Sequence, residues 1–88
     1  MLLYIEELKE DFTNLRKSKE ASLGGCSVSM MQIISIINGL FRDLENEGNL
    51  EEATTKAIYY NLRAQYLKEY EASRELWRKI ERSGNDEK

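Results

Sequence analysis

The stretch from Leu50 to Ser83 contains neither glycine nor proline, the two residues that most strongly interrupt helices. Leu, Ala, Glu, Lys and Arg recur along it, and all of them favour the helical backbone. At 1.5 Å per residue, the stretch predicts a single rod about 50 Å long. Because the whole chain has 88 residues, little sequence remains to cover such a rod, and this limits the folds open to the chain.

Residues 2–22 predict a first helix. Its apolar side chains recur three and four positions apart, the spacing that aligns side chains on one helical stripe. They are Ile5, Leu8, Phe12 and Leu15. The glycine pair at 24–25 follows, and glycine readily adopts the positive φ with which many helices end. We therefore expect the first helix to stop before this pair.

Residues 28–46 predict a second helix that is apolar around most of its circumference, as in helices buried on more than one side. Its β-branched core, 33–37, would also suit a strand. The length of the apolar run and the lack of strict alternation favour a helix. Ser29 is the predicted N-cap because Gln32 follows three residues later, as in a capping box, and Ser27 is a competing cap.

The connection between the second and third helices is short. Gly48 can end the second helix, and Asn49 can cap the third, with Glu52 at the third helical position. A connection of this length makes its two helices neighbours that run in opposite directions. We therefore predict an antiparallel hairpin between residues 28–46 and a third helix over residues 50–83.

Two apolar stripes follow the third helix. The first is rich in small residues that would let the second helix approach closely: Leu50, Ala53, Ala57, Tyr60 and Ala64. The second carries larger side chains: Ile58, Leu62, Tyr66, Tyr70, Ser73, Trp77 and Ile80. Tyr59 and Tyr60 diverge by about 100° on a helix, so at most one of them points fully inward.

The unequal lengths of the helices predict an uncovered surface. The second helix is about 28 Å long and reaches along the third only to about Tyr70. The remaining segment carries Tyr70, Leu76, Trp77 and Ile80, and apolar patches of this kind mark contact surfaces. We therefore predict an all-α, three-helix chain that forms a homodimer, with the ends of the third helices paired across a two-fold axis in a coiled-coil-like, dimeric helical bundle. Whether the first helix packs within its own chain or across the dimer stays open.

The composition argues against catalysis and metal binding. The chain has no histidine, the commonest general base, and Cys26 is its one cysteine, which excludes an internal disulfide. A zinc site built by the protein lacks ligands for the same reason. A thiol at a helix start could act as a nucleophile, but no base accompanies Cys26, and we interpret it as a loop residue. We predict no enzyme activity, no cofactor and no metal.

We predict one helical domain over residues 1–83 and a polar C-terminal tail over 84–88. The longest apolar run, 28–41, is shorter than the roughly 20 residues that cross a bilayer, and acidic residues follow the N-terminus closely. We therefore expect a cytoplasmic protein without membrane partners. The net charge of −3 does not favour long-range attraction to nucleic acid.

These features predict a protein–protein interaction module, such as a small adaptor, regulatory subunit or inhibitor, whose protein partner the sequence does not identify. The predicted contact residues are Tyr66, Tyr70, Arg74, Trp77, Arg78 and Ile80. The alternative is a small dimeric nucleic-acid-binding regulator that uses the arginines of the third helix, Arg63, Arg74, Arg78 and Arg82. Interleaved glutamates weaken the positive field on which this alternative depends.

Overall fold

The computed structural model describes residues 3–46 and 51–86. These residues form three helices, α1 (Leu3–Leu23), α2 (Val28–Asn46) and α3 (Glu52–Asp86), and no strand occurs among them. The predicted all-α class and the three helices are therefore confirmed. The bounds of α2 are those predicted, whereas α3 begins two residues later than predicted and continues through 84–86, which the sequence assigned to the tail.

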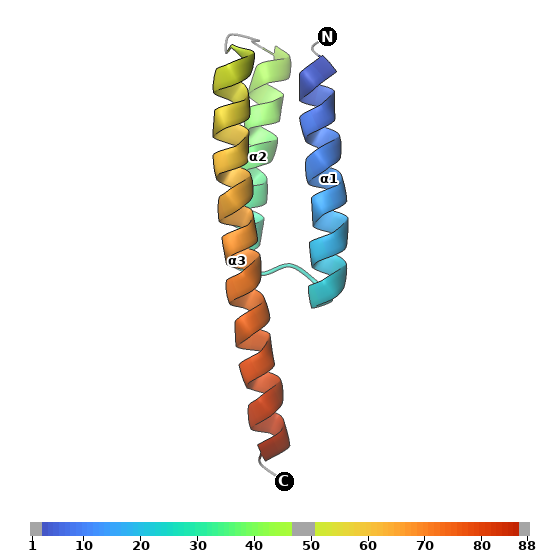
Figure 1. The fold of residues 1–88 in the computed structure, drawn as a ribbon, viewed down its shortest axis with the longest axis vertical. Coiled ribbons are helices and arrows are strands. Elements are labelled where there is room, and N and C mark those ends of the chain that lie inside the picture. The colour runs from blue at the N-terminus through green and yellow to red at the C-terminus, as the bar shows by residue number, and fades with distance from the viewer. Residues whose placement is uncertain (1–2, 47–50, 87–88) are drawn as a thin grey trace.

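The three helices form an elongated bundle (Figure 1). α1 and α3 run in the same direction, and α2 runs in the opposite direction beside α3. α3 packs against both α1 and α2, and it extends far beyond the point where they end. The molecule measures 58 × 17 × 16 Å as a result. The turn predicted at Gly48 and Asn49 lies outside the described residues.

A glycine turn ends α1. The N–H of Gly25 donates to the carbonyl of Glu20 at 3.0 Å, and the N–H of Gly24 donates to the carbonyl of Ala21 at 3.3 Å. These two bonds are the pair found in a Schellman motif, whose left-handed residue is here Gly24 with φ +72°. Gly24 adopts this φ without the steric cost that a Cβ would add, so the sequence prediction of a glycine stop is confirmed.

Ser27, not Ser29, caps α2. The N–H of Met30 donates to Ser27 Oγ at 3.2 Å, and the N–H of Met31 donates to the Ser27 carbonyl at 2.9 Å. The predicted cap at Ser29 is therefore wrong, and the competing cap is the one used. The earlier start satisfies the backbone N–H of Met30, whose side chain is fully buried in the core.

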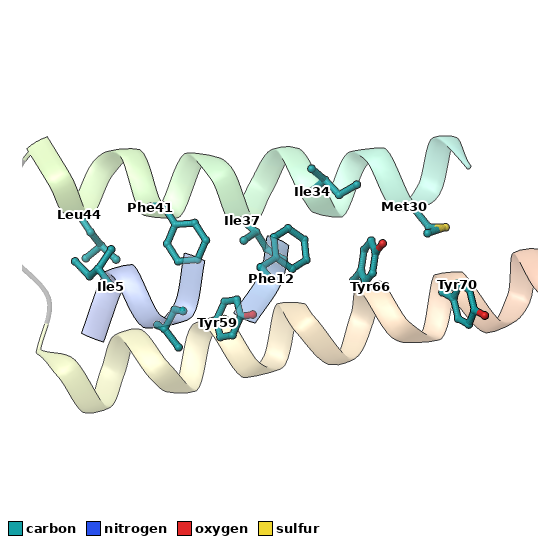
Figure 2. Close-up of a cluster of buried hydrophobic side chains, with 11 residues drawn as sticks. Ile5, Phe12, Met30, Ile34, Ile37, Phe41, Leu44, Tyr59, Tyr66 and Tyr70 are labelled. Carbon is teal, nitrogen blue, oxygen red and sulfur yellow. The ribbon is translucent and has the colours of Figure 1, made fainter. Parts of the chain in front are cut away.

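All three helices contribute to one hydrophobic core (Figure 2). Its buried members are Ile5, Leu8, Phe12, Met30, Ile34, Ile37, Phe41, Leu44, Tyr59, Tyr66 and Tyr70. The Phe12 ring lies edge-on to both Tyr59 and Tyr66, with centroid distances of 6.3 and 5.3 Å. Three of the four residues on the predicted stripe of the first helix are in this core, and Leu15 packs half-buried against it.

α3 turns a different face inward from the one predicted to meet α2. Thr55 and Tyr59 are completely buried. The small residues of the predicted stripe, Ala53, Ala57 and Ala64, are all exposed, and Leu50 lies outside the described residues. That prediction is wrong because tyrosine rings bury far more apolar area than alanine methyl groups do. Tyr60 is half exposed, so only one member of the tyrosine pair points inward, as predicted.

Two glycines in this fold should respond to alanine in opposite directions. We expect Gly24→Ala to lower the free energy of unfolding by about 1–2 kcal/mol, because alanine is strained at positive φ. Gly39→Ala should raise it by about 0.5–1 kcal/mol, because Gly39 lies within α2 and, apart from its adjacent residues and the nearby backbone of α2, no described atom stands within 4 Å of an added Cβ. Urea denaturation of the two variants beside the wild type measures both shifts. A Gly24→Ala variant as stable as the wild type would contradict this description of the α1–α2 turn.

Candidate functional site

The inward face of α3 continues past the end of the bundle. Ser73, Trp77 and Ile80 follow Tyr66 and Tyr70 at helical spacings of three and four residues, so they lie on the same face. α2 begins close to the level of Tyr70 (Figure 2), and α1 ends at Leu23, one residue after Ser22, whose hydroxyl is hydrogen-bonded to that of Tyr70. We call residues 71–86, which reach beyond α1 and α2, the α3 extension. α1 and α2 therefore do not cover the apolar side chains of the extension, whereas they cover those upstream on the same face of α3.

Three large apolar side chains of the α3 extension are exposed, and we call them the apolar patch. The exposed fraction is 60% for Leu76 and 53% for both Trp77 and Ile80. Upstream on the same face, Tyr66 is 0% exposed. α3 is continuous through Glu69, so no second turn folds Trp77 back under its own chain. The exposed end predicted from helix lengths is therefore present in the structure.

The six predicted contact residues divide into two groups. Tyr66 and Tyr70 are buried in the core of their own chain, and they do not belong to the exposed surface. The other four lie exposed on the α3 extension: Arg74, Trp77, Arg78 and Ile80. Leu76 was not among the predicted contact residues, although its side chain is as exposed as that of its neighbour Trp77. Leu76 lies beside the stripe rather than on it, so the stripe spacing did not select it, although the sequence placed it in the uncovered apolar segment.

The buried tyrosines connect α3 to polar side chains of α1. The hydroxyl of Tyr59 donates to Asp11 Oδ2 at 2.5 Å. The hydroxyl of Tyr66 donates to Glu20 Oε2 at 3.4 Å. Further along, the hydroxyls of Tyr70 and Ser22 are 3.0 Å apart and hydrogen-bonded. Each ring fills the core while its hydroxyl reaches the rim of α1, so these tyrosines already have partners within the chain.

The arginines proposed for nucleic acid do not form one free surface. Arg63 Nε lies 2.9 Å from Asp11 Oδ2, the same carboxylate oxygen that Tyr59 contacts. Arg78 lies 3.8 Å from Glu75 on the exposed side of α3. The side chain of Arg82 lies outside the described part. Since Arg63 stabilises the packing of α1 and the glutamates remain interleaved, the geometry gives the nucleic-acid alternative no added support.

The structure assigns no reactive role to Cys26. Burial raises the pKa of its thiol, and the nearby Glu20 carboxylate adds to this shift. A raised pKa reduces the thiolate fraction at neutral pH, which is the opposite of what a nucleophile needs. Among the side chains that the structure describes, no group of three His, Cys, Asp or Glu residues could hold a metal ion.

Over the described ranges, none of the helices has the length and apolar character needed to span a bilayer. Comparisons with protein-family models, with curated proteins and with solved structures gave no significant match. A proposal for the function therefore rests on the geometry of the chain, and the surface considered below is the apolar patch on the α3 extension.

The buried tyrosines predict a loss of stability in alkaline solution. Burial, aided by the Glu20 carboxylate, raises the pKa of Tyr66 to about 12, and burial together with the Asp11 hydrogen bond raises the pKa of Tyr59 further. Tyrosines in the unfolded chain ionise near pH 10, so their stabilising effect is complete below that pH. It is lost as the pH rises through the folded-state pKa, at about 1.4 kcal/mol per pH unit for each tyrosine.

Urea denaturation between about pH 8 and pH 12 measures this dependence. We expect Tyr66→Phe to remove the contribution of one tyrosine and so to flatten the decline above about pH 10. Tyr60→Phe is the matched control, since the Tyr60 ring is half exposed. Equal slopes for the two variants would contradict the assignment of Tyr66 to the buried, hydrogen-bonded set.

Proposed function

We propose that this chain is a non-enzymatic protein–protein interaction module, in the class of small helical adaptors, regulatory subunits and inhibitors, and that it acts through the α3 extension. The observation that carries the proposal is the exposure of Leu76, Trp77 and Ile80 on a helix whose same face is buried upstream. Exposed apolar patches on small proteins mark contact surfaces. The proposed partner is a second copy of the chain, and the two copies would form a dimeric helical bundle.

The composition of the α3 extension fits a contact surface. Trp77 forms the exposed patch together with Leu76 and Ile80, and Arg74 and Arg78 are exposed beside it. Interfaces characteristically surround an apolar, aromatic centre with polar and charged residues, and Trp and Arg are enriched where the binding energy concentrates. Tyr66 and Tyr70 support this surface indirectly, because they fix α3 to the rest of the bundle.

The energy available from the apolar patch fits the proposal of a concentration-dependent homodimer. Completing the burial of three half-exposed side chains on each of two copies contributes roughly 5–9 kcal/mol. Association costs about 4–15 kcal/mol in lost translational and rotational freedom. The two magnitudes are comparable, so burial of the patch alone supports a reversible contact rather than a permanent one. Charged pairs at the rim would then influence the affinity.

Substitution of the apolar patch tests this proposal. We expect the light-scattering mass of the wild type to rise towards that of a dimer with concentration, and Trp77→Ala or Ile80→Ala to weaken the association roughly 30-fold or more, as at a binding hot spot. Tyr60→Ala is the matched control, because Tyr60 and Trp77 are each 53% exposed and only Trp77 lies on the patch. A wild type that stays monomeric at all attainable concentrations would contradict the homodimer.

A further inference from the structure

We propose that the α3 extension pairs with the same segment of a second copy in an antiparallel arrangement of a single register, in which Trp77 packs against Ile80 of the partner subunit. This inference rests on the proposed function of the surface and specifies its partner and geometry. Three observations carry it: the length of the extension, the spacing of its apolar side chains and the order of its charges. Each observation leads to the same register.

The length of the α3 extension selects the overlap. α1 and α2 cover α3 to about Tyr70, and α3 continues to Asp86, so the extension is about 24 Å long. An identical antiparallel segment matches it end to end when the two-fold axis passes between residues 78 and 79. A shift in one direction shortens the overlap. A shift in the other drives the end of each α3 against the α1–α2 end of its partner.

The spacing of the apolar face selects the same axis. Ser73, Trp77 and Ile80 recur at four and three residues, the a and d spacing of a coiled coil. In an antiparallel coiled coil, residues at heptad position a of one helix pack against residues at position d of the other. With the axis between 78 and 79, Trp77 packs against Ile80 of the partner subunit, and the two-fold symmetry produces the same contact a second time. The neighbouring register would pack Ile80 against the partner's Tyr70. That register is excluded, because Tyr70 is buried in its own bundle.

The charges beside this face complement one another in the proposed register. Arg74 and Glu81 are seven residues apart, so they lie on the same flank of α3, and both are exposed. With the axis between 78 and 79, Arg74 lies on the same flank of the contact as Glu81 of the partner subunit, within about 3 Å of it along the helix axis, and the symmetry supplies a second such pair. Leu76 occupies the other flank and extends the apolar contact. A parallel pair would bring identical residues to the same level and would separate Arg74 from Glu81 of the partner subunit by about 10 Å along the axis.

The arrangement has a consequence for shape. Two protomers of 58 Å that overlap by the extension alone form a rod about 90 Å long, with a three-helix body at each end. The dimer would therefore present two identical helical bodies that face away from each other. A parallel pair would place the two bodies side by side and would leave the particle near the length of one protomer.

Charge reversal with rescue tests the register. We expect Arg74→Glu and Glu81→Arg each to weaken the dimer about tenfold or more by sedimentation equilibrium, because each reversal turns two attractive pairs into repulsive ones. The double variant Arg74→Glu/Glu81→Arg should restore an affinity within about threefold of the wild type. Lys79→Glu changes the charge by the same amount on the opposite side of α3, and it should leave the affinity nearly unchanged. Circular dichroism confirms that each variant keeps its helices.

Two outcomes separate this inference from the proposed function. A double variant as weak as the single variants, or a dimer whose length by small-angle scattering stays near 58 Å, overturns the antiparallel register and leaves the dimer in place. A wild type that remains monomeric, with no change on Trp77→Ala, overturns the register together with the homodimer. Restored affinity in the double variant together with a length of about 90 Å supports the register.

Discussion

The packing of the tyrosine face of α3 holds the described fold together, because α3 is the helix that contacts both of the others. Tyr59 illustrates how this face works. Its ring is fully buried, with its centroid 6.3 Å from that of Phe12 on α1 and 5.8 Å from that of Phe41 on α2. Its hydroxyl donates to Asp11 on α1. Tyrosine thus supplies apolar area to the core and a directed polar contact at the rim, which fixes the position of α1 along α3.

The exposed α3 extension follows from the same packing. α1 and α2 are shorter than α3, so the face that binds them continues into solvent with Trp77 and Ile80 still on it. A helical segment of this length gains little stability by itself in water, because most helical stability in proteins comes from tertiary packing. A second helix laid on the face would supply that packing. The unequal helix lengths therefore also produce the exposed surface that we propose as the contact surface.

The sequence predicted the number and bounds of the helices well, because glycine pairs and unbroken helical periodicity are local signals. It also predicted the exposed end of α3, since helix lengths follow from residue counts alone. The inward face of α3 was harder. Thr55 is polar yet fully buried, and its hydroxyl oxygen lies 3.5 Å from that of Tyr4 on α1. Because Thr55 is polar, the apolar periodicity of the sequence does not include it and favours the alanine stripe instead.

The exposure of the predicted contact residues was predicted only in part, and the failure has a related reason. Trp77 and Ile80 are exposed as expected, but Tyr66 and Tyr70 are covered within their own chain. How far α1 reaches along α3 decides this difference, and it depends on long-range contacts such as that of Tyr70 with Ser22. Lys19 of α1 also lies 5.0 Å from the centroid of the Tyr70 ring. These pairings join residues that are 48 and 51 positions apart, and local sequence patterns do not encode them.

Amide hydrogen exchange at different protein concentrations tests the central claim most directly, because it reports the order of the α3 extension residue by residue. We expect the amides from Leu76 to Ile80 to exchange quickly in dilute solution and to become protected as the concentration rises, while those around Tyr59 stay protected throughout. Protection of Leu76 to Ile80 that is the same at every concentration would contradict the claim that this segment is a surface awaiting a partner.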